Sequence, residues 1–228
     1  MRKIIFLTVA AVMILAASCG QRQPKTEDDA KALAAEVNCS SISSYDGFLI
    51  VPGVRVGAFV LNKEYTPVEV EEAYPLYSKE TDRLGETEIK RGETIILDFS
   101  SMYDKNDRLI ENSVKDIIRV HAGDFSTEEG LKVGATLEEL LKAYSIYTLL
   151  TPNEDLENLE FKNADDMVKY FLENGYSVYE DLAIFYPLDA KGKRTGIGFY
   201  LTLKEPLDLK KFKTESKVHL ITVEVVEN

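Results

Sequence analysis

The sequence predicts an α+β protein, with antiparallel β-sheet and helices on one face, arranged as two tandem strand-turn-helix modules. Residues 94–99, 114–121 and 218–226 alternate apolar and polar side chains or are rich in β-branched residues, as strands are. Residues 136–144 carry apolar side chains at helical spacing. A third observation, an internal repeat, indicates that the two kinds of element recur in the same order.

The repeat joins residues 53–58 (GVRVGA) to residues 130–135 (GLKVGA), which match position for position in residue type. Each copy leads to a helix with an acidic first turn that ends in Ala-Tyr, at Tyr74 and at Tyr144. Two copies indicate tandem modules, because a solenoid needs more repeats. We therefore expect residues 47–122 and 123–228 to form two α+β modules.

The second copy has the clearest local signals. Leu131–Val133 lies between two glycines and alternates apolar and basic residues, which predicts a short strand. Thr136 and Glu139 have the spacing of a capping box, so the next helix should begin at Leu137. Its apolar positions, Leu140 among them, predict a buried face.

The remaining elements follow from turn and cap residues. The segments 94–99 and 114–121 should pair as antiparallel neighbours. Asn163 should cap a helix over 164–174. Residues 176–186 and 197–203 predict two strands joined by the turn at 189–193. The class is therefore α+β, with antiparallel sheet and helices on one side.

The N-terminus has the pattern of a targeting signal. Two basic residues and a short apolar run precede Cys19, which predicts that residues 1–18 are a secretory signal peptide. The ending Leu15-Ala16-Ala17-Ser18-Cys19 resembles the lipobox of bacterial lipoproteins, although the large aliphatic residue lies one position further from the cysteine than usual. The resemblance implies that Cys19 is the lipid attachment site and that the protein is anchored in the cell envelope, at the outer membrane. The alternative is an ordinary secretory signal with a chance cysteine.

Residues 19–46 are polar and acidic and predict a flexible tether. Cys39 lies within it and has no partner once Cys19 carries lipid. The net charge of the whole chain is −12. Removal of residues 1–18 leaves 25 Lys and Arg against 39 Asp and Glu, a net charge of −14. No basic patch remains to neutralise phosphates, which argues against a nucleic-acid partner.

The stretch 127–140 (TEEGLKVGATLEEL) resembles a motif that joins a strand to a helix in envelope lipoproteins and secreted proteins. It is similar to segments of the outer-membrane assembly lipoproteins of the SmpA/OmlA type and of the tandem β-lactamase-inhibitor-protein-like domains. The resemblance implies a small sheet with helices on one face and protein binding by the other. The motif is structural in those families and implies no catalytic residue.

No catalytic constellation is recognisable in the sequence. Its two histidines, His121 and His219, have neither a nucleophile motif nor metal-ligand spacing beside them. We therefore expect no catalytic residue, no metal site and no cofactor. The alternative is a hydrolase or carbohydrate-binding protein whose carboxylates converge in a cleft after folding.

Tyrosine is abundant, with 12 residues, and several gather around the hairpin predicted near residue 190. Tyrosine is favoured at recognition surfaces, because it buries much area at little entropic cost. Tyr179, Tyr186 and Tyr200 are the candidate partner-binding residues, and the alternative is that they pack in the core. The sequence thus predicts a membrane-tethered, non-enzymatic envelope lipoprotein that binds another envelope protein or a peptide through its sheet face.

Overall fold

The computed structural model describes residues 47–151, 159–174, 183–202 and 209–226. All described residues belong to one compact unit, which begins at Tyr45. The predicted signal peptide and tether, Cys19, Cys39 and Tyr179 all lie outside the described residues.

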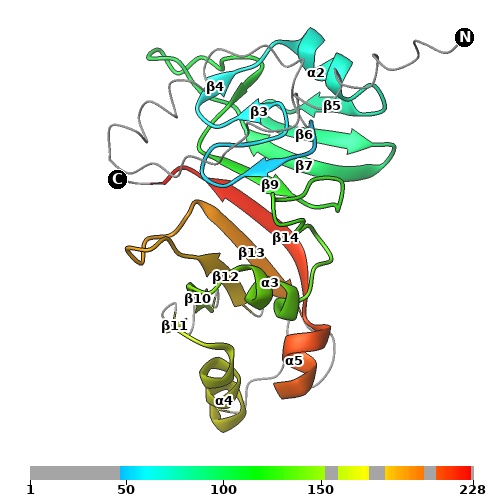
Figure 1. The fold of residues 1–228 in the computed structure, drawn as a ribbon. Coiled ribbons are helices and arrows are strands. Elements are labelled where there is room, and N and C mark those ends of the chain that lie inside the picture. The colour runs from blue at the N-terminus through cyan, green and yellow to red at the C-terminus, as the bar shows by residue number, and fades with distance from the viewer. Residues whose placement is uncertain (1–46, 152–158, 175–182, 203–208, 227–228) are drawn as a thin grey trace, which may run out of the picture. The chain divides into compact units, whose positions relative to one another are not determined.

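One nine-stranded sheet dominates this unit (Figure 1). Each strand pairs antiparallel with its neighbours. In spatial order the strands are β11 (Glu160–Phe161), β10 (Tyr147–Leu150), β12 (Ala183–Pro187), β13 (Ile197–Thr202), β14 (Lys217–Glu224), β9 (Ile117–Val120), β7 (Thr94–Ser100), β6 (Glu86–Arg91) and β5 (Ser78–Thr81).

The other elements are short. The helices are α2 (Pro67–Ala73), α3 (Leu137–Ala143), α4 (Ala164–Asn174) and α5 (Leu209–Glu215). A three-stranded sheet consists of β1 (Ile50–Val51), β2 (Arg55–Val56) and β3 (Phe59–Val60), and a two-stranded one of β4 (Lys63–Glu64) and β8 (Ser113–Val114). This combination of antiparallel sheet with helices is the α+β class that the sequence predicts. None of the helices in the described ranges is long and apolar enough to cross a membrane.

The order of elements divides the large sheet into two halves. In one half, α2 precedes β5, β6, β7 and β9 along the chain, and these strands run in that order from the edge to the centre. In the other half, α3 precedes β10, β12, β13 and β14, which also run toward the centre. The two halves meet where β9 pairs with β14, so they form one continuous sheet.

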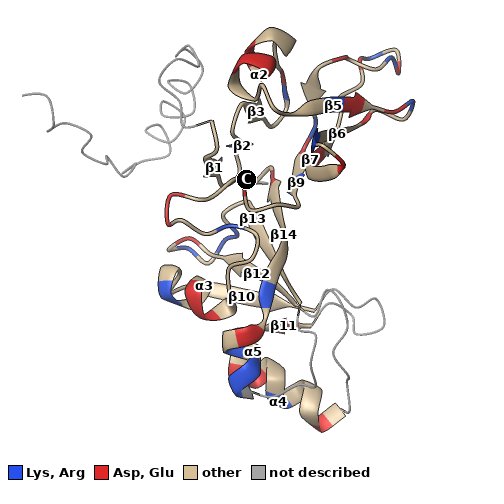
Figure 2. Ribbon diagram, turned by 90° about the vertical axis from the view of Figure 1, so that its right-hand side faces the viewer, with Lys and Arg blue, Asp and Glu red and all other residues tan. Residues whose placement is uncertain are grey.

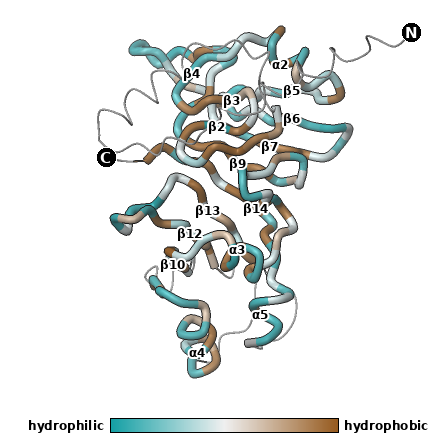
Figure 3. Tube along the Cα trace, viewed as in Figure 1, coloured by the Kyte–Doolittle hydropathy of each residue, from teal (hydrophilic) through white to brown (hydrophobic). Residues whose placement is uncertain are grey.

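One face of the sheet, here called the core face, is apolar. A row of paired residues crosses it through Leu97, Val120, Ile221, Phe199 and Phe185, each with 0% exposure. Buried side chains from all four helices that carry described residues join this row in a single hydrophobic cluster, for example Val70, Leu140, Phe171 and Phe212. The apolar stretches along β3, β7 and β14 are visible in Figure 3.

The local predictions around α3 are confirmed for the helix and wrong for the strand. Thr136 and Glu139 form the expected capping box, and α3 begins at Leu137. Leu131–Val133 is not a strand but part of a turn. Gly130 and Gly134 on either side have φ angles of 80° and 97°, which fold the chain back on itself, so the Thr127 amide donates to the Leu131 carbonyl at 2.9 Å.

Candidate functional site

The second face of the large sheet differs in chemistry from the core face. Side chains alternate along a strand, so the neighbours of each core-face residue belong to this second face. One row crosses it from β6 to β10, and every step except the one between Gly198 and Tyr186 is a registered pair. In order, the row is Glu88, Asp98, Arg119, Thr222, Gly198, Tyr186 and Thr148. The row is charged in the half that includes β9 and carries hydroxyl and aromatic groups in the half that includes β14.

The charged half is a network of ion pairs. Asp98 on β7 is paired with both Arg119 and His121. Burial alone would raise the pKa of the Asp98 carboxyl, but the hydrogen bond from His121 and the charge of Arg119 outweigh it and lower the pKa. Acidic and basic residues occur together on β5 and β6, where Figure 2 shows both colours. Such mutually neutralised charges order the sheet face and have little capacity left for a charged ligand.

The aromatic half contains two of the three predicted tyrosines. Tyr186 on β12 and Tyr200 on β13 lie on the second face, and neither belongs to the core cluster. Tyr186 is 5% exposed and Tyr200 is half-buried. Burial raises the pKa of the Tyr186 hydroxyl, and the nearby Tyr200 and Glu224 raise it further. The sequence therefore selected two residues that do lie together.

A glycine makes room for the Tyr186 ring. A Cβ atom at Gly198 would lie 2.9 Å from the Tyr186 ring and 2.8 Å from the Thr222 hydroxyl oxygen. Thr222 is 2% exposed, and its hydroxyl has no hydrogen-bond partner among the described residues. His219, where β14 bulges, places its ring edge-on to Tyr200 with 6.4 Å between the centroids. The aromatic half is thus a closely packed polar and aromatic layer.

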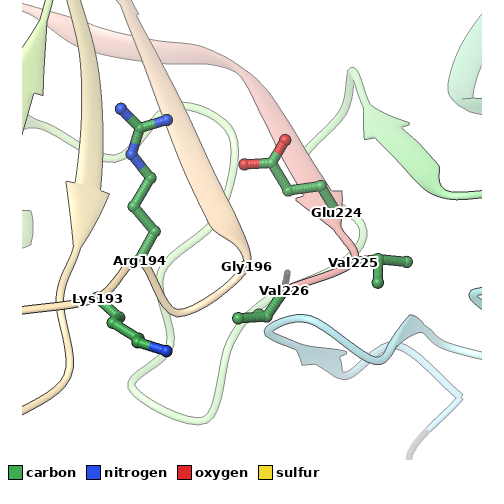
Figure 4. Close-up of a pocket in the computed structure, with 6 residues that line it drawn as sticks. All are labelled: Lys193, Arg194, Gly196, Glu224, Val225 and Val226. Carbon is green, nitrogen blue, oxygen red and sulfur yellow. The ribbon is translucent and has the colours of Figure 1, made fainter. Parts of the chain in front are cut away.

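A pocket of about 480 Å³ lies at the end of this layer, where the β12–β13 hairpin meets the end of β14. Its lining is Lys193, Arg194, Gly196, Glu224, Val225 and Val226 (Figure 4). In Figure 4 the Arg194 and Glu224 side chains extend on the same side of the strands, and Lys193 points in another direction. The pocket therefore combines two cations, one carboxylate and an apolar wall.

Arg194 joins the pocket to the predicted tyrosines. Its guanidinium lies over the Tyr186 ring, 4.1 Å from the centroid. A cation in this position is attracted by the ring electrons, and the planar group can stack there. Across the pocket, burial raises the pKa of the Glu224 carboxyl, and the charge of Arg194 opposes that shift. The two charged groups influence each other without forming an ion pair within 4.0 Å.

Arg194 and Glu224 are not among the site residues that the sequence predicts. Arg194 directly follows the segment 189–193, which was interpreted as a hairpin turn, and Glu224 lies in a segment interpreted as a strand. Both interpretations are correct, since the Asp189 carbonyl accepts from Gly192 at 3.0 Å and Glu224 ends β14. The excess of cations in the turn, Lys191, Lys193 and Arg194, was the available signal. Groups of three or more potential metal ligands do not occur among the described residues.

Comparison with known proteins finds no matching family and no similar curated protein. Among solved structures, the fold is similar to the crystal structure of the uncharacterized protein yfeY from Escherichia coli. The two chains are 12% identical, the match covers 76% of this chain and 98% of that one, and the TM-score is 0.39.

Proposed function

We propose that the protein is a lipid-anchored, non-enzymatic component of the cell envelope, and that it binds another envelope protein or a peptide through the second face of its large sheet. The observation that carries this proposal is the aromatic half of that face. Tyr186, Tyr200 and Thr222 form a layer outside the core cluster, and the layer ends in a pocket with charged groups. Tyrosine and arginine are the residues most enriched at protein-recognition sites.

The anchor is the second part of the proposal. Residues 1–18 have the pattern of a signal peptide, and Cys19 follows its run of small residues. Acylation of Cys19 would hold the protein at the outer membrane with residues 19–46 as a tether, because several acyl chains bind a membrane far more tightly than one. The acidic chain, at net charge −12, favours no electrostatic attachment to anionic lipids.

The two halves of the sheet support a tandem arrangement like that of the SmpA/OmlA-type and inhibitor-protein-like families. Each half has a seven-residue helix followed by four strands that run in chain order toward the centre, and the second half has the short β11 as an additional strand at its edge. We interpret residues 47–122 and 123–228 as the two modules, with α4 and α5 as additions to the second. Both halves contribute to one core, and we assign partner binding to the second face, where Tyr200 is half-buried and the pocket opens.

Site-specific photocrosslinking tests the binding proposal. A photoreactive amino acid at position 200 should give a discrete crosslinked product in intact cells. The same amino acid at Glu138, which is exposed on α3, provides the matched control, because α3 packs against the core face. Products at position 138 in place of 200, or none at position 200, would contradict binding through the second face.

The anchoring proposal has its own test. Mass spectrometry of the mature protein should find an acylated Cys19 as the N-terminal residue, and the protein should sediment with outer membranes. A Cys19→Ala variant should no longer partition with membranes. An unmodified Cys19, or a soluble periplasmic form of the wild-type protein, would reject this part.

One observation favours the alternative of a hydrolase or carbohydrate-binding protein. Glu224 has a raised pKa and lines a pocket, as a general acid does. A glycosidase requires a second carboxyl group facing the first across the substrate. Glu224 is the one carboxylate in the lining that the described residues provide. We therefore place the binding function first. A screen of glycan and ester substrates with the wild-type protein and Glu224→Gln tests the alternative, and turnover that depends on Glu224 would favour the hydrolase.

A further inference from the structure

The β12–β13 hairpin is locally basic in an acidic protein. The Asp189 carboxylate accepts hydrogen bonds from the Lys191 and Lys193 amides at 2.8 and 2.9 Å. These bonds fix the turn, and Gly192 adopts the φ of +77° that it requires. Three cations, Lys191, Lys193 and Arg194, therefore leave a rigid turn in defined directions. An anionic group is attracted to this hairpin although the chain as a whole is negative.

Arg194 is oriented but its hydrogen-bond donors are not used. Its guanidinium rests on the Tyr186 ring, and within the described residues it makes no hydrogen bond or ion pair. A stacked guanidinium keeps its edge N–H groups in one plane, which is the geometry that binds both oxygens of a carboxylate. Stacking on a buried ring also removes much of the entropy that a free arginine loses on binding. The side chain is therefore prepared for an acidic ligand.

Glu224 limits what that ligand can be. Its carboxylate lines the same pocket, beyond ion-pair distance of Arg194, and has no hydrogen-bond partner in the described part of the chain. A phosphate would place two charges close to this carboxylate, which is repulsive. A ligand with one negative charge and a neighbouring N–H donor would satisfy both groups. A peptide carboxyl terminus has this combination, because amide N–H groups precede the carboxylate.

The rest of the lining suits a terminal aliphatic side chain. Val225 and Val226 are 38% and 37% exposed and form the apolar wall. Gly196 lets the lining pack closely on the chain at Gly53, since a Cβ there would lie 2.5 Å from the Gly53 Cα and 2.7 Å from a methyl group of Val226. The volume of about 480 Å³ is within the range of small-ligand pockets and accommodates two or three residues.

We propose that this pocket binds the free carboxyl terminus of a partner peptide chain. Arg194 holds the terminal carboxylate, and Lys193 adds positive charge to the lining without reaching the same group. Glu224 accepts a hydrogen bond from a peptide N–H, and the last side chain lies against Val225 and Val226. This inference rests on the proposed binding function and specifies which part of the partner the second face recognises.

Two peptide probes distinguish recognition of a carboxyl terminus from other modes of peptide binding. A fluorescent hexapeptide that ends in two valines is prepared with a free carboxyl terminus and as the carboxamide, and its anisotropy is measured with the full-length protein in detergent. The free acid should bind at least about tenfold more tightly than the amide, which corresponds to the loss of a charge-assisted bidentate interaction. Equal binding of the two probes would reject the carboxyl-terminus inference and leave the proposed function intact.

Variants of the hairpin locate the site. Arg194→Gln should weaken binding of the free acid about tenfold and leave the amide unchanged, so that the preference disappears. Lys191→Gln is the matched control, because it removes the same charge from the same turn without touching the lining, and it should change the affinity by less than about threefold.

If Arg194→Gln lowers the melting temperature through loss of its stacking on Tyr186, Lys193→Gln provides the second test. It should weaken the free acid several-fold without disturbing that stack. Absence of binding by both probes at millimolar concentration, or an unaltered preference in both pocket variants, would overturn the inference. The photocrosslinking experiment at position 200 tests the proposed binding function independently of these variants.

Discussion

Tyr74 and Tyr144 occupy equivalent places in the two halves of the sheet. Each follows a seven-residue helix as its C-cap, and each donates its backbone N–H to the carbonyl four residues earlier, at 2.9 Å. The Tyr144 ring lies against Phe185 and Phe199, with 6.1 Å between centroids in both cases. The Tyr74 ring stacks on Phe59, which in turn packs on Phe99. In both halves, a helix-terminal tyrosine therefore connects the helix to core-face phenylalanines, and the consequences can be tested by mutation.

Leu140 should be critical for α3. It is 0% exposed in the core cluster, so Leu140→Asp would bury a carboxylate without a partner. We expect a loss of about 3–5 kcal/mol in the free energy of unfolding. Leu172→Asp, at a leucine of α4 that is 53% exposed, is the matched control and should cost less than about 1 kcal/mol. Urea denaturation of both variants measures the difference, and equal values would mean that α3 does not pack as described.

Gly57 and Gly134 hold equivalent places in the repeat, but only Gly57 lacks space. Both have positive φ angles, +54° and +97°. A Cβ at Gly57 would lie 1.9 Å from the Tyr74 hydroxyl, whereas at Gly134 nothing lies within 4 Å. Gly57→Ala should therefore cost about 3 kcal/mol and Gly134→Ala about 1 kcal/mol, the backbone contribution alone. Thermal unfolding followed by calorimetry gives both values, and a larger loss at position 134 would contradict the packing around Tyr74.

Asp98 should make stability depend on pH at the acid end. Its folded-state pKa is lower than the ordinary value of 3.8, so its contribution to stability is present above that pH and is lost as the pH falls through the folded-state pKa. Asp98→Asn should cost about 1–3 kcal/mol at pH 7, since Arg119 and His121 lose their common acceptor. The cost should shrink at pH 3. A loss that is the same at both pH values would show that the charge of Asp98 is not responsible.

Glu224 should change the pH dependence of stability in the opposite direction from Asp98. Burial raises its pKa above 4.5, so the folded state is penalised as the pH rises through this range, and the penalty is complete above the folded-state pKa. Glu224→Gln should therefore stabilise the unliganded protein at pH 7, with an increase of roughly 2 °C in melting temperature, and should have little effect at pH 4. A destabilised Glu224→Gln at pH 7 would mean that the carboxylate has a partner in the free protein.

Local features of the fold could be predicted from the sequence. Thr136 and Glu139 are three residues apart, so their capping box depends on neighbours alone, and the Asn163 cap of α4 is also local, with the Asp166 amide donating to the Asn163 side chain at 2.8 Å. The antiparallel pairing of β7 with β9 followed from two apolar segments around a turn. The turn at Leu131–Val133 was missed, because three alternating residues between glycines suit a strand and a turn equally.

The site was only partly predictable. Tyr186 and Tyr200 were found because aromatic residues near one hairpin are visible in the chain. Arg194 and Glu224 line the same pocket because of the register between β13 and β14, in which Ile197 is opposite Val223. A shift by one residue would move Glu224 to the core face, which the apolar alternation of β14 opposes. The residue of β13 that lies opposite Glu224 is decided by the pairing in the folded sheet and is not visible in either segment.

The position of β14 has a consequence for the order of folding. β14 comes last among the strands along the chain but lies between β13 and β9 in the sheet. Until residues 217–224 have left the ribosome, the strand from each half that will flank the centre has an unpaired edge, and such edges pair readily with other chains. The sheet can thus become continuous only after β14 has been synthesised. Many contacts between residues distant in sequence then form together, which makes folding slow. Such a fold is suited to a chain that is held unfolded until its last strand is available.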